Sequence, residues 1–302
     1  MLLTAIIPIG NISRCHRNLI SRIEQASELN FQIKLVFDDV RVDEVDAFFS
    51  KIGRKENIKV FCGKYGQAGI ARNEALKDVT TRWLVFWDSD DDVYPERVFE
   101  MVRTADNRGA QGAIASYELT SESSIASPLL RTYYPDKEGQ PDFDSALGIW
   151  RLAFRTDVIH GNKIDFPSLR VGEDVLFVLK FLLLNPVVSL FPSIVYNYSV
   201  GNVLQTTSIR TKSEDTLLII LELLRHSKVN LSHSNHKLIR QLLVLQFLTL
   251  MRSFHMRGIS RSRMSINFNK REICFICFFL IPVQSVKRAF RVVLSHKKGV
   301  EI

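Results

Sequence analysis

Short apolar runs alternate with amphipathic helical patterns over the first hundred residues. The segments at 17–29, 43–52 and 69–78 have helical spacing, and each lies between two apolar runs that predict buried strands. Those runs are residues 2–8, 33–37, 58–62 and 83–87. Strand–helix alternation is typical of an α/β domain with a mainly parallel sheet. Ligands of such sheets lie beyond the carboxyl ends of the strands, so the residues after each strand are the first candidates for chemistry.

The pattern is looser between residues 112 and 203, and it is purely helical afterwards. In the looser part we predict strands at 113–119, 187–191 and 194–198, and helices at 146–154 and 173–184. Its aromatic residues Trp150, Tyr196 and Tyr198 are expected in the core rather than on a sugar. After Val203, the segments at 216–225 and 236–256 predict helices only. We therefore predict one domain at 1–203, with halves 1–111 and 112–203, and a helical region at 204–302.

Composition bounds the class of protein. Hydrophobic residues make up 46% of the chain and charged residues 24%, as in a globular protein. No apolar stretch reaches the length that a membrane-spanning helix needs. Residues 1–8 are too short for a signal-peptide core and lack a basic leader, so they predict a strand. Four cysteines do not make a disulfide framework and favour a reducing compartment. We expect a cytoplasmic protein.

The positive charge of the chain lies at its end. Residues 251–302 contain eleven Lys or Arg against two Glu, so their net charge is +9, while the whole chain carries +8. Because the rest of the chain is nearly neutral, a nucleic-acid-binding protein is disfavoured, and an anionic surface is the expected partner of the tail. The apolar run at 273–283 lies within this charge, a pattern typical of a segment at a membrane interface. Packing of the run on the preceding helices is the alternative.

Deletion of residues 273–302 is expected to shift the protein from membrane to soluble fractions. Each cation near an anionic surface adds about 1 kcal/mol of binding, so several together hold the tail without an anchor. High salt should partly reproduce the shift. A full-length protein that ignores anionic vesicles at low salt would show that the tail is structural.

Four carboxylates follow the strand at 83–87 within five positions, in the sequence WDSDDD at 87–92. Like charges this close repel one another unless a cation or solvent compensates. Oxygen ligands on a loop suit Mg²⁺ or Mn²⁺, which also bind a substrate diphosphate. The alternative is an acidic turn that caps the helix starting at Pro95. We assign Asp88 and Asp90 to the metal, and Asp91 and Asp92 to the cap.

Two further acidic pairs follow the same logic. Asp38 and Asp39 end the second strand, and Glu173 and Asp174 begin an apolar helix, where the helix dipole alone would favour them. Their order and spacing relative to the other motifs is more specific. The series runs LTAIIPIGN at 3–11, the acidic pair at 38–39, GQAGIARN at 66–73, WDSDD at 87–91 and GED at 172–174. It resembles the inverting glycosyltransferases of family 2, over roughly the first two-thirds of the chain.

The resemblance implies a GT-A fold, Rossmann-like with a mainly parallel sheet, in which residues 1–111 bind a nucleotide-sugar and residues 112–203 bind the acceptor. It implies that Pro8 and Asn11 line the nucleoside site and that Asp39 accepts a hydrogen bond from the base, as uracil would offer. Arg72 would face the diphosphate. Two positions depart from the family pattern and border the base pocket, namely Gly10 and the segment 40–42.

The resemblance also implies the chemistry. Asp88 would approach the ribose or the metal, Asp90 would bind Mn²⁺ or Mg²⁺, and Asp174 would be the general base. The expected reaction moves a sugar, from a UDP-linked donor by this reading, to a glycan or lipid-linked acceptor in surface-polysaccharide biosynthesis. The expected location is the cytoplasm or the inner face of the plasma membrane. An inactive relative that binds a nucleotide-sugar or glycan as a partner module is the alternative, which retention of Asp39 together with Asp90 and Asp174 disfavours.

Overall fold

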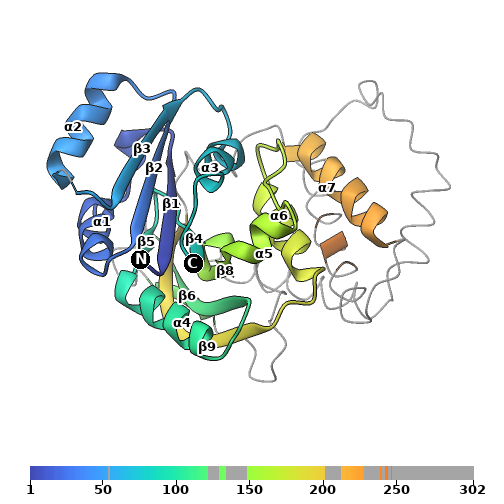
Figure 1. The fold of residues 1–302 in the computed structure, drawn as a ribbon. Coiled ribbons are helices and arrows are strands. Elements are labelled where there is room, and N and C mark those ends of the chain that lie inside the picture. Colours follow the sequence, from blue (N-terminus) through green and yellow to red (C-terminus); the bar gives the residue numbers. More distant parts are fainter. Residues whose placement is uncertain are drawn as a thin grey trace, which may run out of the picture. The chain divides into compact units, whose positions relative to one another are not determined.

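The structure is a computed structural model of the chain, and it describes residues 1–53, 55–121, 129–133, 148–200 and 212–227, with residues 239, 242, 243 and 246. The chain divides into two compact units, Met1–Ser208 and Ile209–Ile302. The first unit contains a nine-stranded sheet with the order β3-β2-β1-β4-β8-β6-β9-β5, and β7 pairs with β6 (Figure 1).

The strands β1 to β4 are parallel, and one α-helix lies between each strand and the next along the chain. The strands are β1 (Leu3–Ile9), β2 (Gln32–Asp38), β3 (Ile58–Gly63) and β4 (Trp83–Phe86), and the helices are α1 (Leu19–Glu28), α2 (Val42–Ile52) and α3 (Ala68–Leu76). These elements confirm the predicted alternation. In Figure 1, α3 lies on one face of the sheet, and α1 and α2 lie on the other. Ile9 pairs with Phe37 and Ile6 with Phe86, so the carboxyl ends of β1, β2 and β4 share one edge.

The rest of the sheet is mixed. Its elements are β5 (Asp92–Val93), α4 (Pro95–Asn107), β6 (Gly112–Ser121), β7 (Leu129–Tyr133), β8 (Leu152–Arg155), α5 (Thr156–Gly161), α6 (Glu173–Leu182) and β9 (Val188–Val200). β8 lies antiparallel between β4 and β6, while β6 and β9 run parallel. The mainly parallel sheet that the sequence predicts therefore describes β1–β4 and the β6–β9 pair, and β5, β7 and β8 are antiparallel.

One prediction in this half is wrong, and two strands that were predicted separately are continuous. The helix predicted at 146–154 is, in its described part, a 3₁₀ turn (Ile149–Arg151) followed by β8. Ala153 and Phe154 pair with both β4 and β6, so sheet pairing on two sides overrides the local helical pattern. The strands predicted at 187–191 and 194–198 form one strand, β9, whose pairing with β6 shifts register on either side of Ser116.

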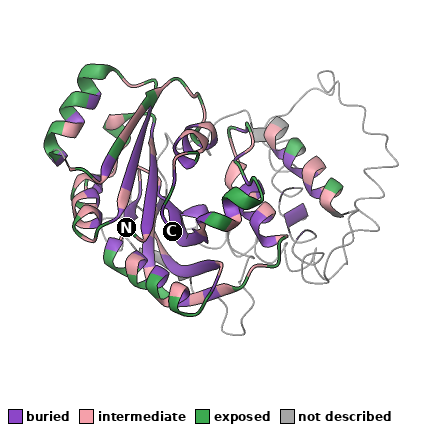
Figure 2. Ribbon diagram, viewed as in Figure 1, coloured by how far each residue is buried: buried purple, intermediate pink, exposed green. Residues whose placement is uncertain are grey.

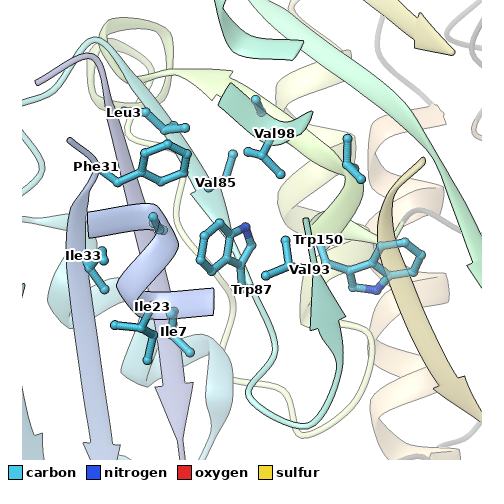
Figure 3. Close-up of a cluster of buried hydrophobic side chains, with 14 of the residues drawn as sticks. Leu3, Ile7, Ile23, Phe31, Ile33, Val85, Trp87, Val93, Val98 and Trp150 are labelled. Carbon is cyan, nitrogen blue, oxygen red and sulfur yellow. The ribbon is translucent and has the colours of Figure 1, made fainter. Parts of the chain in front are cut away.

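The sheet is covered by two hydrophobic cores. On the α1, α2 and α4 face, Trp87 is 1% exposed and lies among Phe31, Val85 and Val93 (Figure 3). Exposed positions lie on the outward sides of α2 and α4, while the central strands are buried (Figure 2). These contacts fix the carboxyl end of β4. The acidic turn, residues 88–92, begins there.

The second core consists of aromatic residues under α6. Phe86 of β4 contacts Phe166 and Phe177 edge to face, with ring centroids 5.1 and 5.4 Å apart. Phe166 and Phe177 stack at 4.2 Å, and Phe154 of β8 packs against Phe177 at 5.5 Å. This cluster attaches α6 to the end of β4, although the two segments are about ninety residues apart in the sequence.

In the second unit, α7 (Lys212–Ser227) confirms the helix predicted at 216–225. Residues 239, 242, 243 and 246, the only described part of the segment 236–256, are helical. The predicted boundary at Val203 and the tail segment 273–283 lie outside the described residues. Within the described ranges, no helix combines the length and hydropathy required to cross a bilayer.

Candidate active site

Arg72 joins two of the predicted acidic groups. Its side chain is 5% exposed, and its Nη1 donates to Glu173 Oε1 at 3.0 Å while Nη2 pairs with Asp88. Burial lowers the pKa of Arg72, but the charges of Asp88 and Glu173 outweigh it, so the net direction is upward and the guanidinium stays charged. The cation therefore lies between the turn after β4 and the first turn of α6.

The motif GQAGIARN places this arginine by helical spacing. Gly69, Arg72 and Asn73 are three and four residues apart on α3, so they share one face of the helix. Asn73 Nδ2 donates to the Phe166 carbonyl and its Oδ1 accepts from the Phe166 N–H, both at 2.9 Å. A Cβ on Gly69 would lie 2.9 Å from Glu173 Cγ. Only glycine at this position allows α3 to approach the start of α6 so closely.

Asp174 begins α6 beside this ion pair. Gly172, with φ of 81°, adopts the left-handed conformation and turns the chain into the helix, so Glu173 and Asp174 occupy its first turn. Asp174 Oδ1 accepts from the Val175 N–H at 2.8 Å. Burial and the neighbouring Glu173 raise the pKa of Asp174 to about 7, and Arg72 partly opposes them. Burial likewise raises the pKa of Glu173. A carboxyl that titrates near neutral pH suits a general base.

Asp90 lies in the turn after β4 with Asp88. Burial and the charge of Asp88 raise the pKa of Asp90 to about 6, although Arg72 and Arg14 oppose the shift. No ion pair to Asp90 is present in the described part of the chain. The backbone N–H of His16 donates to the Ser89 carbonyl at 2.7 Å, which brings the loop after β1 against this turn. Asp90 therefore has the negative charge of Asp88 close by and, among the described residues, forms no ion pair with a side-chain cation.

Asp91 and Asp92 do not cap α4. The N-cap of α4 is Tyr94, without a side-chain cap, and Pro95 starts the helix as expected. Asp92 instead pairs with Arg22 at 2.8 Å and accepts from Asn18. Asp91 is 4% exposed and bonds to β9. The predicted cap is wrong because the chain enters β5 at Asp92, before α4 begins, and both carboxylates are buried and bonded to other elements.

Asp38 and Asp39, at the end of β2, have different contacts and different exposure. Asp38 Oδ1 accepts from the backbone N–H groups of Tyr65 and Gly66, at 2.5 and 3.0 Å, and so shapes the loop before α3. Asp39 has a positive φ of 56° and a side chain that is 69% exposed and 3.1 Å from Lys64. Asp39 is therefore the accessible member of the pair, as its predicted contact with a base requires.

Pro8 and Asn11 lie at the end of β1 and just beyond it. Pro8 is half-buried, and Asn11 is exposed. The Asn11 side chain accepts from Ser13 N at 2.9 Å and from Ser13 Oγ at 2.7 Å, so its oxygen caps the 3₁₀ turn Ile12–Arg14. Because this oxygen is used in the cap, the predicted nucleoside contact of Asn11 would involve its side-chain nitrogen or its backbone.

The acidic turn fits a divalent metal whose coordination is completed by the substrate. Among the described residues, no three His, Cys, Asp or Glu side chains are placed to enclose an ion. Mg²⁺ commonly binds one or two carboxylates and completes its shell with substrate phosphates and water. Asp88 and Asp90 would supply those carboxylates, and the raised pKa of Asp90 indicates a negative charge that a bound cation would stabilise. The residues fit a metal shared with a diphosphate.

Sequence reasoning missed the contacts that support the turn. Tyr196 and Trp150 are core residues, as predicted, at 0% and 7% exposure. The Tyr196 hydroxyl, however, also bonds to Asp91 and to the Asp88 N–H, across more than one hundred residues of sequence. No local pattern marks a tyrosine in a strand for such a role. The burial of Arg72 is equally invisible, because an arginine on a short helix is ordinarily exposed.

Comparison with known proteins agrees with this arrangement. The model of the family described as glycosyl transferase family 2 matches residues 5–157, half of the chain. The succinoglycan biosynthesis protein ExoO of Rhizobium meliloti is 26% identical over 179 residues, which cover 55% of this chain and 51% of that protein. The match thus spans about half the length of this relative.

Solved structures show the same fold. S. aureus TarS 1-349 in complex with UDP-GlcNAc has a TM-score of 0.63 at 18% identity, covering 94% of this chain and 83% of the other. The mannosyltransferase PcManGT of Pyrobaculum calidifontis, in complex with GDP-Man and Mn²⁺, has a TM-score of 0.53 at 10% identity, covering 98% and 86%. The predicted fold class, a GT-A domain, is confirmed.

Proposed function

The chain belongs to glycosyltransferase family 2, and from that membership we propose that it transfers a sugar, with inversion, from a nucleotide-sugar to a glycan or lipid-linked acceptor. The observation that carries the proposal is the buried Arg72, which links Asp88 of the acidic turn to α6, the helix that begins with Glu173 and Asp174. UDP-GlcNAc in the TarS complex supports a UDP-linked donor. The name of ExoO supports a role in polysaccharide biosynthesis.

The residues divide between the two substrates. Pro8, Asn11 and Asp39, at the carboxyl ends of β1 and β2, are proposed to bind the nucleoside. Asp88 and Asp90 are proposed to hold Mn²⁺ or Mg²⁺ at the diphosphate. When bound, such an ion stabilises the negative charge of a departing diphosphate.

Asp174 is proposed to take the proton from the acceptor hydroxyl. Asp174 is half-buried at the start of α6, and the pKa of its carboxyl, raised by burial to about 7, matches a group that accepts a proton near neutral pH. With one base, the acceptor oxygen forms the new bond to the anomeric carbon from the face opposite the diphosphate, whose bond to that carbon breaks. Inversion follows, and no covalent enzyme intermediate is required.

Arg72 has a supporting role in this proposal. Both of its terminal nitrogens contact carboxylates, so it orients Asp88 and the first turn of α6 and lowers the repulsion among Asp88, Glu173 and Asp174. The contact with a diphosphate that the family resemblance implies would add to this role. The enzyme is proposed to act in the cytoplasm or at the inner face of the plasma membrane, with the basic residues 251–302 meeting anionic lipid.

A thermal-shift panel of nucleotide-sugars with and without Mn²⁺ tests the proposal. A ligand that binds only the native state stabilises it by about 2.7 kcal/mol at one hundred times its Kd, so a true donor raises the Tm and needs the metal to do so. Release of nucleoside diphosphate with a glycan acceptor then distinguishes an enzyme from a binding module. A panel without any shift would contradict donor binding.

Asp90→Ala is expected to abolish metal-dependent donor binding without loss of fold. Asp90 has no ion pair in the described part of the chain, and Asp88 repels it, so its removal should leave the apo Tm unchanged or slightly higher. Calorimetric titration with Mn²⁺ and donor measures the loss. Asp46→Ala, at an exposed position on α2, is the matched control and should bind as the parent does. Unchanged donor affinity in Asp90→Ala would refute the metal assignment.

A further inference from the structure

The Tyr196 hydroxyl contacts both ends of the acidic turn. It accepts a hydrogen bond from the Asp88 N–H at 3.2 Å and donates one to Asp91 Oδ2 at 3.0 Å. The other carboxylate oxygen of Asp91 accepts from the Ser199 N–H at 2.8 Å. Asp90 lies between the two anchored residues, so β9 determines where the turn that contains it begins and ends.

The tyrosine itself has little freedom to move. Its ring is 0% exposed and stacks on Trp150, with centroids 4.5 Å apart and planes 16° from parallel. Its backbone pairs with Tyr117 of β6 and with Val93 of β5. A hydroxyl held by a ring in the core and by two neighbouring strands is a fixed point against which a loop can be positioned.

We propose that Tyr196 and Asp91 are positioning residues that hold Asp88 and Asp90 in the geometry that the donor diphosphate and its metal require. The proposal rests on the proposed function, because it assumes that Asp88 and Asp90 bind the donor diphosphate and its metal. It assigns no substrate contact to Tyr196 or Asp91. Asp91 contributes a carboxylate to the acidic turn, but it is 4% exposed and both of its oxygens accept hydrogen bonds. Asp91 therefore supports Asp88 and Asp90 and does not add a third metal ligand.

The ordinary alternative is that these bonds only stabilise the fold. Residues that orient metal ligands typically change metal affinity or activity by about 10–100-fold when they are removed, whereas a fold-stabilising bond changes the melting temperature alone. The two readings separate in a variant that keeps the ring and loses the hydroxyl. Tyr196→Phe is that variant, because phenylalanine preserves the stack on Trp150.

Amide hydrogen exchange of the apo protein is the first measurement. In Tyr196→Phe the Asp88 N–H loses its acceptor, so its exchange should accelerate by about tenfold or more. Tyr94→Phe is the matched control, because the Tyr94 hydroxyl also donates to a carboxylate, that of Glu118 at 2.9 Å. It should leave the Asp88 amide unchanged. Exchange at Asp88 that is equal in the parent and Tyr196→Phe would overturn the proposal.

Donor titration in Mn²⁺ is the second measurement. Tyr196→Phe should weaken the binding of UDP-GlcNAc by about tenfold or more, and Tyr94→Phe by no more than about twofold. Faster exchange with parental donor affinity would show that the hydroxyl orders the turn without serving binding, and would overturn the positioning role. Asp91→Asn, which replaces the acceptor of the Tyr196 hydroxyl and leaves the acceptor of the Asp88 N–H in place, should reproduce the loss of donor affinity if Tyr196→Phe does not fold. A parent that binds no nucleotide-sugar refutes the proposed function, and a parental exchange pattern in Tyr196→Phe refutes the positioning role by itself.

Discussion

Replacing Asp174 by asparagine is expected to lower the rate of sugar transfer by about 10²–10⁴ while donor affinity stays at the parental value. An amide of the same shape cannot accept the proton of the acceptor hydroxyl. It can still accept the Val175 N–H through its oxygen, so the start of α6 should be preserved. Product formation under saturating donor gives the rate, and calorimetry gives the donor affinity.

Asp157→Asn is the control for this variant. Asp157 is the second residue of α5 as Asp174 is of α6, and its Oδ1 accepts from the Val158 N–H at 2.9 Å. The two aspartates thus share a helix-terminal role, and only Asp174 lies beside Arg72 and Glu173. Asp157→Asn should transfer sugar at the parental rate. Near-parental transfer by Asp174→Asn would show that Asp174 is a helix-terminal residue and nothing more.

The raised pKa of Asp174 also predicts a pH dependence. A base must be deprotonated, so kcat/KM should fall about tenfold per unit below pH 7, and Asp174→Asn should lack this limb. The folded-state pKa of about 7 is above the ordinary value of 3.8, so the native state binds the extra proton. The contribution of this carboxyl to stability is therefore present below about pH 4 and is lost as the pH rises through 7. Asp174→Asn should raise the Tm above that of the parent at pH 8 and not at pH 4.

The sequence predicts the fold well where burial is continuous and local. The strands β1 to β4 are apolar runs flanked by helical segments, and their type follows from periodicity alone. It fails at 149–155, where Ala153 and Phe154 are strand residues because β4 and β6 pair with them from both sides. It fails again around Pro192, which interrupts the pattern of β9 without ending the strand. In both places the outcome depends on a partner strand that is distant in sequence.

The candidate site divides in the same way. Carboxylates that follow strands are visible as a spacing, so Asp39, Asp88 and Asp90 can be predicted as a group. The sequence does not show which carboxylates are neutralised, and the structure assigns Asp92 to Arg22 and Asp91 to Tyr196. Such pairs join segments about seventy and one hundred residues apart, and their chemistry is set by the fold and not by neighbouring residues.

Arg72→Met is expected to destabilise the protein by about 3–5 kcal/mol, because it removes the cation from a buried cluster and leaves the carboxylates uncompensated. Asp88 and Glu173 are 27% and 12% exposed, so solvent screens them poorly. Thermal or denaturant unfolding at pH 8 measures the loss. Arg41→Met, which removes an exposed arginine paired with Asp43, is the control and should leave the Tm nearly unchanged.

Two further measurements separate the electrostatic role of Arg72 from mere packing. The charge of Arg72 lowers the pKa of Asp174, so in Arg72→Met the acidic limb of kcat/KM should move to higher pH. The double variant Arg72→Met with Asp88→Asn should recover part of the lost stability, because one of the stranded charges is removed with its partner. If packing alone were lost, the second substitution would add to the damage and the pH profile would stay in place. Recovery in the double variant together with a shifted limb would show that the charge of Arg72 couples Asp88 in the acidic turn to Glu173 and Asp174 in the first turn of α6.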